Sequence, residues 1–260
     1  MTFYGDWTSI ESFPSSSARS LISVKLDARA LRKNSLRLVG EKKHSGDDRF
    51  IASCEVLFIH TWTWTAIEAD TKLIVSWLVG GRDGEYALAF MDDLRSRLAT
   101  RVQLTSDGHR AYLEAVEGAF GGDVDYAQLV KIYGEAPGPK GRYSPADCVG
   151  AKKVRVEGSP DPAHVSTSYA ERQNLSMRMH MRRFTRLTNA FSKKVENHMH
   201  MVALYNVFYN FTRVHKTLRM APAMAAGVTD RLWDMAEIAE MIEAAAPKQG
   251  KRGPYKKRLS

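Results

Sequence analysis

Two carboxylates stand where they could hold a divalent metal ion. Asp107 follows the apolar residues 102–104 and precedes a glycine, so the sequence predicts it at the end of a strand and the mouth of a sheet. Glu171 stands near the start of a predicted basic helix. Carboxylate oxygens suit Mg²⁺ and Mn²⁺, and such ions can activate a nucleophile and neutralise the transition state of phosphodiester transfer. The pair therefore predicts metal-assisted chemistry on nucleic acid, provided that the fold brings Asp107 and Glu171 together.

Basic side chains follow the second carboxylate along the same predicted helix. Spacings of three and four residues put Glu171 on one face with the arginines at 178 and 182. Guanidinium groups bind phosphate oxygens well, so an acid backed by arginines fits a DNA strand passing over the site. The alternative for Glu171 is a helix-start carboxylate stabilised by the helix dipole. The predicted DNA-binding residues are Arg172, Arg178, Arg182, Arg183, Arg186, Lys193 and Lys194.

The positive charge of the chain is concentrated in this region. The net charge is +9, and residues 169–220 hold ten Lys or Arg against two Glu. A positive surface attracts polyanions, because neutralising phosphates releases condensed counterions. A solvated helix face is the alternative for a basic helix. The adjacent acidic residues favour nucleic acid as the partner.

The histidines offer weaker candidates. His109 lies two residues after Asp107, where it could orient a phosphate or a water, or serve only as a local hydrogen-bonding residue. His198 and His200 are two apart on a predicted helix and point to different faces, which disfavours a zinc pair. The aromatic stripe that follows them at residues 205–211 predicts core packing, with base stacking as the alternative.

The order of predicted elements places the candidate residues on a mixed α/β sheet flanked by helices, with a helical C-terminal section. We predict strands from β-branched and aromatic runs and helices from the 3.6-residue apolar period. The predicted strands are 54–67, 73–79 (after a turn at 68–72), 102–105 and 126–133. The predicted helices are 86–98, 110–119, 169–188, 192–212 and 230–245.

Three segments follow from this pattern. Residues 1–51 are poorly organised, with either a short basic helix at 20–38 or an ill-packed arm. Residues 52–219 form the catalytic-type domain, and they include a long loop at 134–167 that is rich in proline. Residues 220–260 hold a helix and a basic tail that could touch phosphates.

The composition predicts a cytoplasmic protein without a membrane partner. Two cysteines, Cys54 and Cys148, make no disulfide framework. No apolar run approaches the roughly 20 residues of a membrane helix, and the N-terminus has no signal-peptide pattern.

Several motifs, in the same order along the chain, resemble those of the DDE transposases of the insertion-sequence-one type, over roughly residues 60 to 243. The resemblance implies a ribonuclease H-like fold with Mg²⁺ or Mn²⁺ held by an acidic triad, in which Asp107 is the second acid and Glu171 the third. It also implies cleavage and strand transfer on double-stranded DNA, at insertion-sequence ends and target, by a homo-oligomer. The motifs stand at residues 62–64, 70–73, 105–109, 166–174, 182–187, 189–194 and 215–218.

The first acid of the triad is missing from its expected place. Such transposases carry an Asp-Glu-x-Trp-like motif on the opening strand, and this chain has none before Trp62. Asp70, Glu55, Asp47 and Asp48 are the possible substitutes, although an aspartate in a turn such as Asp70 has an ordinary structural role. Three hypotheses remain: a transposase or an inactive copy of one, a noncatalytic DNA-binding protein on the same scaffold, and a structure-specific nuclease.

Overall fold

A computed structural model describes residues 49–58, 61–134, 148–184 and 194–245. Within these ranges, only the backbone is described at residues 53–58. It also describes the backbone of two short antiparallel strands, β1 (Ser23–Lys25) and β2 (Arg37–Val39). The candidate residues Asp47, Asp48, Arg186 and Lys193 and the basic tail at 246–260 lie outside these residues.

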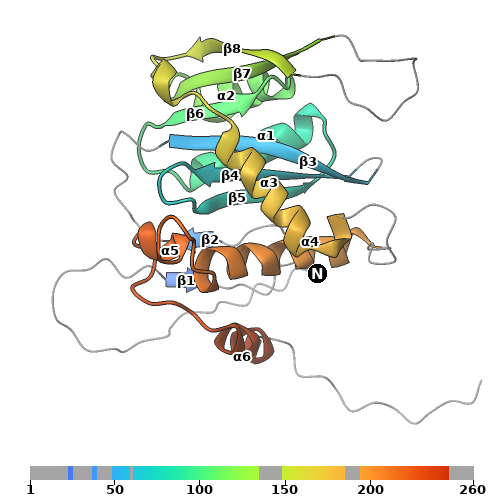
Figure 1. Cartoon of the computed structure of the whole chain (residues 1–260), viewed down its shortest axis with the longest axis vertical. Helices are drawn as coiled ribbons and strands as arrows, with labels where there is room; N and C mark the ends of the chain where they lie inside the picture. The colour runs from blue at the N-terminus through green and yellow to red at the C-terminus, as the bar shows by residue number, and fades with distance from the viewer. Residues whose placement is uncertain are drawn as a thin grey trace, which may run out of the picture.

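A six-stranded mixed sheet forms the centre of the molecule, in the order β5-β4-β3-β6-β7-β8 (Figure 1). β3 pairs antiparallel with β4 and parallel with β6, β6 pairs parallel with β7, and β7 pairs antiparallel with β8. This is a ribonuclease H-like α/β arrangement, so the predicted fold class is confirmed. The strands are β3 (Arg49–Phe58), β4 (Thr61–Glu68), β5 (Ile74–Gly80), β6 (Gln103–Asp107), β7 (Asp125–Tyr133) and β8 (Cys148–Glu157).

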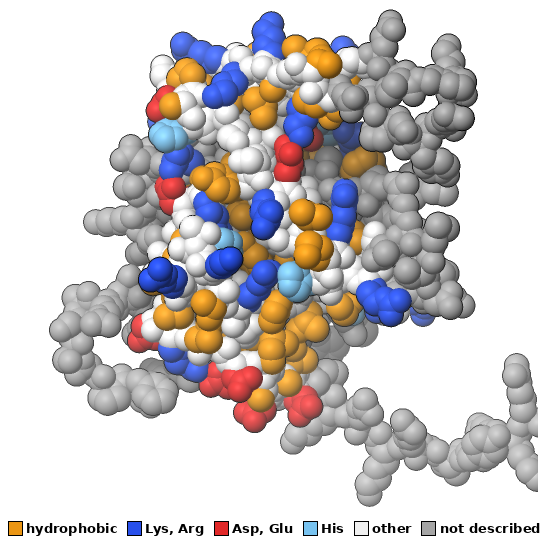
Figure 2. Space-filling view, viewed as in Figure 1, with side chains coloured by type: hydrophobic (Ala, Val, Ile, Leu, Met, Phe, Trp, Pro, Cys, Tyr) orange, Lys and Arg blue, Asp and Glu red, His pale blue; other side chains and the backbone are white. Residues whose placement is uncertain are grey.

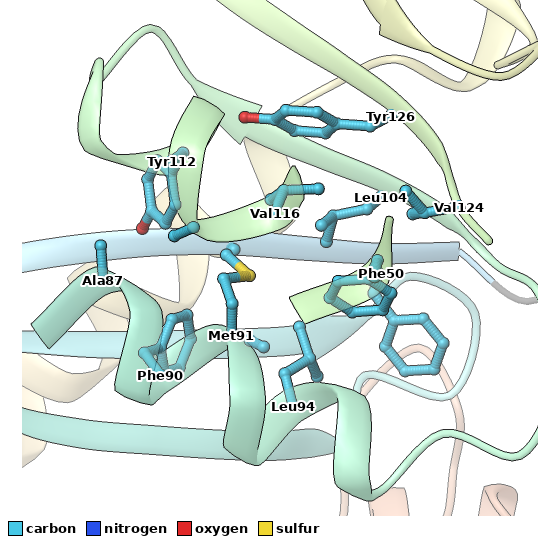
Figure 3. Packing of buried hydrophobic residues seen from close by; sticks show 14 of the residues in the cluster. Phe50, Ala87, Phe90, Met91, Leu94, Leu104, Tyr112, Val116, Val124 and Tyr126 are labelled. Carbon is cyan, nitrogen blue, oxygen red and sulfur yellow. The ribbon is translucent and has the colours of Figure 1, made fainter. Parts of the chain in front are cut away.

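Helices α1 (Gly84–Ser96) and α2 (Ala111–Phe120) cover one face of the sheet. α1 begins where the side chain of Asp83 accepts a hydrogen bond from the backbone of Tyr86, an ordinary N-cap. Its apolar residues recur every three or four positions and are buried against the sheet and α2 (Figure 3). The contact face of α1 consists of Ala87, Phe90, Met91 and Leu94.

Helices α3 (Ser168–His180) and α4 (Val195–Val207) cover the opposite face. Figure 1 shows α3 crossing the sheet diagonally from the β7–β8 side toward α4. Ala170 of α3 packs on Ile51 of β3 and Ile67 of β4, whereas Phe50 and Ala66 on the same strands pack toward α1 and α2. Alternation along each strand therefore separates the two faces.

The first residue of the edge strand β5 is capped by a side chain rather than by a neighbouring strand. α4 continues into a π-helical turn, Phe208–Thr212, which places Asn210 beside Ile74. The amide of Asn210 accepts from the Ile74 nitrogen at 3.0 Å and donates to the Ile74 oxygen at 2.9 Å. Both backbone groups of Ile74 are satisfied as a neighbouring strand would satisfy them.

Helices α5 (Pro222–Ala225) and α6 (Met235–Ala245) complete the described chain. Ile238 of α6 is buried in a small cluster with Phe211, which lies 4.6 Å from Trp233 between ring centroids. In the part of the chain that the structure describes, every helix is too short or too polar to cross a membrane.

Most predicted elements are confirmed with small shifts at their ends. The helices predicted at 86–98 and 110–119 are α1 and α2, and the strands predicted at 73–79 and 126–133 are β5 and β7. The aromatic stripe packs in the core as predicted, since Tyr205, Tyr209 and Phe211 are all buried.

Three predictions of local structure were wrong. The single strand at 54–67 is instead the β3–β4 hairpin, in which Val56 pairs with Trp62. The chain reversal was not predicted because β-forming residues continue through both strands. The basic helix at 20–38 is contradicted by the strands β1 and β2, because its apolar residues were too loosely spaced to fix a helical face. The loop at 134–167 contains β8, an exposed edge strand without the apolar face that marks most strands.

The helix predicted at 169–188 is also shorter than expected. α3 ends at His180, and Met181 has an extended backbone before a 3-10 turn, Arg182–Phe184. Met181 is buried and Phe184 packs edge-on against the ring of His198, with 5.2 Å between centroids. The chain therefore leaves the helix to bury these two side chains, and Arg182 does not continue the face of Glu171.

Candidate nucleic-acid site

Asp107 ends β6 at the carboxyl end of the parallel strands. Its Cα pairs with Leu129 of β7, and the residue before it, Ser106, pairs with Ala52 of β3. One carboxylate oxygen, Oδ1, accepts a hydrogen bond from the backbone nitrogen of His109 at 3.1 Å, which fixes the turn after the strand. The side chain of Asp107 is half-buried, so the carboxylate lies at the end of a strand, as the sequence predicts.

Glu171 lies in the first turn of α3 and already has two donors. The ammonium of Lys131 on β7 is 2.8 Å from Oε1 of Glu171, and the hydroxyl of Thr167 donates to the same oxygen at 2.6 Å. Burial pushes the pKa of Glu171 upward, but the hydrogen bonds from Lys131 and Thr167 outweigh it and hold the pKa below its usual value. Glu171 is therefore an anion with a resident counter-ion.

The two carboxylates share one face of the sheet. Asp107 is paired with Leu129, and Lys131 is two residues further along β7, so the three positions point to the same side. The Lys131 side chain reaches Glu171 on α3. A second path agrees, because Thr105 alternates with Asp107 and pairs with Ile51, which packs on α3. The fold therefore places Asp107 on the side of the sheet that α3 covers.

Two carboxylates on one face of the sheet could hold one hydrated divalent ion. Mg²⁺ keeps several waters and is held by one or two carboxylates in many sites. Asp107 and Glu171 supply two hard oxygen ligands, and each uses one oxygen in a hydrogen bond to the protein. Among the described residues, the structure has no group of three His, Cys, Asp or Glu side chains that could hold a metal ion. Asp107 and Glu171 stay the predicted ligands of Mg²⁺ or Mn²⁺.

The possible substitutes for the first acid fare differently. Asp70 forms an ion pair with Arg49, which lowers the pKa of the Asp70 carboxyl. Arg49 pairs with Gln103, four residues before the end of β6, so this ion pair is roughly 13 Å along the strands from Asp107. Asp70 therefore belongs to the opposite end of the sheet. Glu55 lies on β3, where its Cα pairs with Thr63, two residues past the position beside Asp107.

The predicted DNA-binding side chains are spread over α3 and the segments after it. Arg172, Arg178 and Arg182 are exposed, Arg183 is half-buried in the 3-10 turn, and Lys194 is exposed before α4. Figure 2 shows Lys and Arg side chains distributed over this face, with acidic side chains gathered at the lower edge of the view. The face is basic, although its arginines do not form the single stripe that a longer helix would give.

The ring of His109 is held by aromatic contacts rather than by the acids. Its ring stacks on Trp64 at 6.1 Å and meets Tyr112 edge-on at 5.9 Å between centroids. Its Nε2 lies 3.3 Å from the backbone oxygen of Arg82. Trp64 belongs to the core under α1 and α2, so these contacts favour the local structural role for His109.

Sequence reasoning missed a basic flank beside the two acids. Lys153 of β8 pairs with Leu129, which itself pairs with Asp107, and Arg155 pairs with Ala127. Paired residues share a face, so Lys131, Lys153 and Arg155 lie on the α3 side of the sheet. The alternation of Val154 and Val156 with basic residues is the signal that could have predicted this strand. We refer to Lys131, Lys153 and Arg155 as the β7–β8 basic flank.

The sequence matches no known protein family and no curated protein. Among solved structures, the chain is similar to a chain of the cryo-EM structure of the simian T-cell lymphotropic virus intasome in complex with PP2A regulatory subunit B56 gamma. The TM-score is 0.43 and the identity 10%, over 80% of this chain and 60% of that chain. The match thus spans less than two thirds of the solved chain. The order and register of the strands, and not this distant similarity, define the fold.

Proposed function

We propose that this chain is a transposase-type protein that binds double-stranded DNA at insertion-sequence ends and serves metal-dependent strand cleavage and transfer. The observation that carries the proposal is the placement of Asp107 and Glu171 on one face, at the carboxyl end of the parallel strands and beside basic side chains. A bound Mg²⁺ or Mn²⁺ supplies activation of the attacking oxygen and neutralisation of charge on the phosphate.

The protein's own residues position and neutralise the DNA in this proposal. Arg172 on α3 and the β7–β8 basic flank lie on the acid-bearing side of the sheet, where they would contact phosphates. Such contacts fix the position of the duplex without reading its sequence. Asp107 and Glu171 would hold the ion against the phosphate between these contacts. Because two DNA ends must meet, we expect the working form to be a homo-oligomer.

A second candidate function is DNA binding without catalysis. Two observations favour it: the described side chains include no third acid beside Asp107, and Lys131 already neutralises Glu171. Among the residues that the structure describes, Glu55 is the remaining candidate for the missing ligand, since it lies on β3 near the position beside Asp107. Loss of one ligand weakens a metal site, so little or no turnover is expected unless Glu55 completes it.

Cleavage and joining on an end-containing duplex with Mn²⁺ separate the candidates. We expect the wild type to cleave weakly and Asp107→Asn to abolish cleavage, with DNA affinity retained in both. Asp92→Asn is the matched control, because Asp92 is an exposed acid on α1, on the other face. Glu55→Gln tests the third ligand and should remove cleavage only if Glu55 takes part.

Three outcomes would revise the proposal. Equal, negligible cleavage by wild type and Asp107→Asn, with salt-sensitive binding intact, would establish the noncatalytic function. Cleavage without joining would indicate a structure-specific nuclease. Absence of salt-dependent DNA binding in the wild type would contradict all three DNA-directed functions.

A further inference from the structure

Lys131 occupies a place that a divalent ion would otherwise share. Its ammonium is 2.8 Å from Oε1 of Glu171, and the same oxygen accepts the Thr167 hydroxyl at 2.6 Å. Charge-assisted hydrogen bonds of this length are among the stronger polar contacts in proteins. An ion that binds Glu171 through Oε1 must therefore compete with Lys131 and Thr167, and an ion that binds through Oε2 lies close to the Lys131 ammonium.

The competition is electrostatic as well as steric. Two cations beside one carboxylate repel each other, and the repulsion is only partly screened near a protein surface. Glu171 carries a single negative charge, which the ammonium of Lys131 already balances. Lys131 in this position therefore lowers the affinity of Glu171 for a divalent ion.

The surroundings offer the lysine another anion when DNA is present. The Lys131 side chain is 35% exposed, so it can turn toward solvent without breaking a core contact. Its neighbours on the same side are Lys153 and Arg155 of β8, which with Lys131 make a cationic track leading to the acids. A DNA backbone drawn to this track would present phosphate oxygens to the displaced ammonium.

We propose that Lys131 is an exchangeable counter-ion: it holds Glu171 while the site is empty of DNA, and it passes to a DNA phosphate when DNA binds, which frees Glu171 for the divalent ion. This inference rests on the proposed function for its DNA step. The competition between Lys131 and the metal ion rests on the proposed metal site alone and does not require DNA.

The exchange couples the two ligands thermodynamically. If DNA takes the lysine from Glu171, DNA raises the affinity for the metal ion, and the metal ion must raise the affinity for DNA by the same factor. Loss of Lys131 removes the coupling and leaves the metal affinity high from the start. The site would then hold a metal ion whether or not DNA is present.

Titration of the DNA-free protein with Mn²⁺ by calorimetry tests the competition directly. We expect Lys131→Met to bind Mn²⁺ about tenfold more tightly than the wild type, within the usual range of site-to-site coupling. Lys131→Arg keeps the charge and should bind Mn²⁺ as the wild type does. Lys153→Met is the matched control, since it removes a charge from the same flank while Lys153 contacts the backbone oxygen of Pro162 rather than Glu171. Glu171→Gln should weaken Mn²⁺ binding in every background.

A second measurement tests the transfer of Lys131 to DNA. The affinity for a fluorescent duplex, measured by anisotropy with and without Mn²⁺, should rise with Mn²⁺ about tenfold in the wild type and in Lys153→Met. In Lys131→Met it should not rise. Circular dichroism and the thermal midpoint confirm that each variant is folded.

The results distinguish failure of the inference from failure of the proposed function. Unchanged or weaker Mn²⁺ binding by DNA-free Lys131→Met, or equal tightening by Lys153→Met, would overturn the counter-ion role. An Mn²⁺-dependent gain in DNA affinity that persists in Lys131→Met would overturn the exchange. A wild type that binds no duplex overturns the proposed function and the DNA step, while the DNA-free titration still decides the competition.

Discussion

The two faces of the central sheet differ in the polarity of the side chains that they bury. The face under α1 and α2 is a single apolar cluster that runs across β3, β4, β6 and β7 and contains Trp64, Phe90 and Leu104, all fully buried. The face under α3 and α4 has smaller apolar clusters interrupted by polar groups. The buried polar residues on α3, α4 and the turn after it are Gln173, Asn174, His198, Asn206 and Asn210.

This difference separates stability from function within one sheet. An apolar face gains free energy from every side chain it buries, whereas a buried polar group gains only when it finds a partner. Gln173 donates to the Tyr205 hydroxyl at 3.1 Å, but among the described residues neither amide atom of Asn206 has a hydrogen-bond partner. The acids and the β7–β8 basic flank lie on this more polar side. Burial on the α1–α2 face thus stabilises the fold, while the other face holds the charged residues of the candidate site.

The largest expected effect comes from opening the apolar face. Phe90→Ala should lower the free energy of unfolding by about 3–5 kcal/mol, because a fully buried ring leaves a cavity. Urea denaturation measures the change, with Leu175→Ala on α3 as the control, since Leu175 is 46% exposed and should alter stability by less than about 0.5 kcal/mol. A loss below about 1 kcal/mol at Phe90 would contradict the contrast between the faces.

An intermediate effect is expected from the buried histidine of the polar face. Burial lowers the pKa of His198 to about 4, with a smaller contribution from Arg183. The unfolded chain binds this proton near pH 6.5, so the free energy of unfolding should fall by about 3 kcal/mol as the pH drops from above 6.5 to 4. His198→Gln should remove that part of the pH dependence.

Denaturation of wild type and variants at pH 7 and pH 4.5 measures the slope. His200→Gln is the control, because His200 is exposed two residues away on the same helix. An equally steep loss of stability toward acid in His198→Gln and the wild type would show that His198 is not the group responsible.

The smallest expected effect is on the charged surface of the polar face. Arg172 is exposed on α3 next to Glu171. Arg172→Ala should leave the free energy of unfolding within about 0.5 kcal/mol of the wild type and weaken duplex binding several-fold, with a salt dependence reduced by about one phosphate contact. Anisotropy at two salt concentrations measures both, and Arg231→Ala, outside α3 and paired with Glu237, is the control. Equal loss in the two variants would indicate only a net-charge effect.

Elements with a regular spacing of apolar residues could be predicted from the sequence. Elements whose ends depend on contacts with distant residues could not. α1 carries its apolar residues at helical spacing, so its packing against the sheet follows from the sequence alone. The end of α3 does not, because burial of Met181 and Phe184 against another helix decides it. β8 was missed for a related reason: the alternation of Val154 and Val156 with basic residues marks only its last part, and pairing with β7 establishes the rest of the strand.

The candidate site was predictable to a similar extent. Asp107 could be placed at a strand end from its neighbours, and Glu171 near a helix start, and both placements agree with the structure. No pattern in the sequence indicates that Lys131, forty residues before Glu171, is its ion-pair partner. A contact between distant residues depends on the register of β7 and the path of α3, neither of which is a local property.

The amide of Asn210 has a consequence for how the molecule meets its own copies. Exposed strand edges invite other strands to join them, which leads to aggregation. The side chain of Asn210 already hydrogen-bonds to the backbone nitrogen and oxygen of Ile74 in β5, so an incoming strand would have to displace Asn210 to pair there. A single side chain thus blocks lateral strand pairing at the Ile74 end of β5.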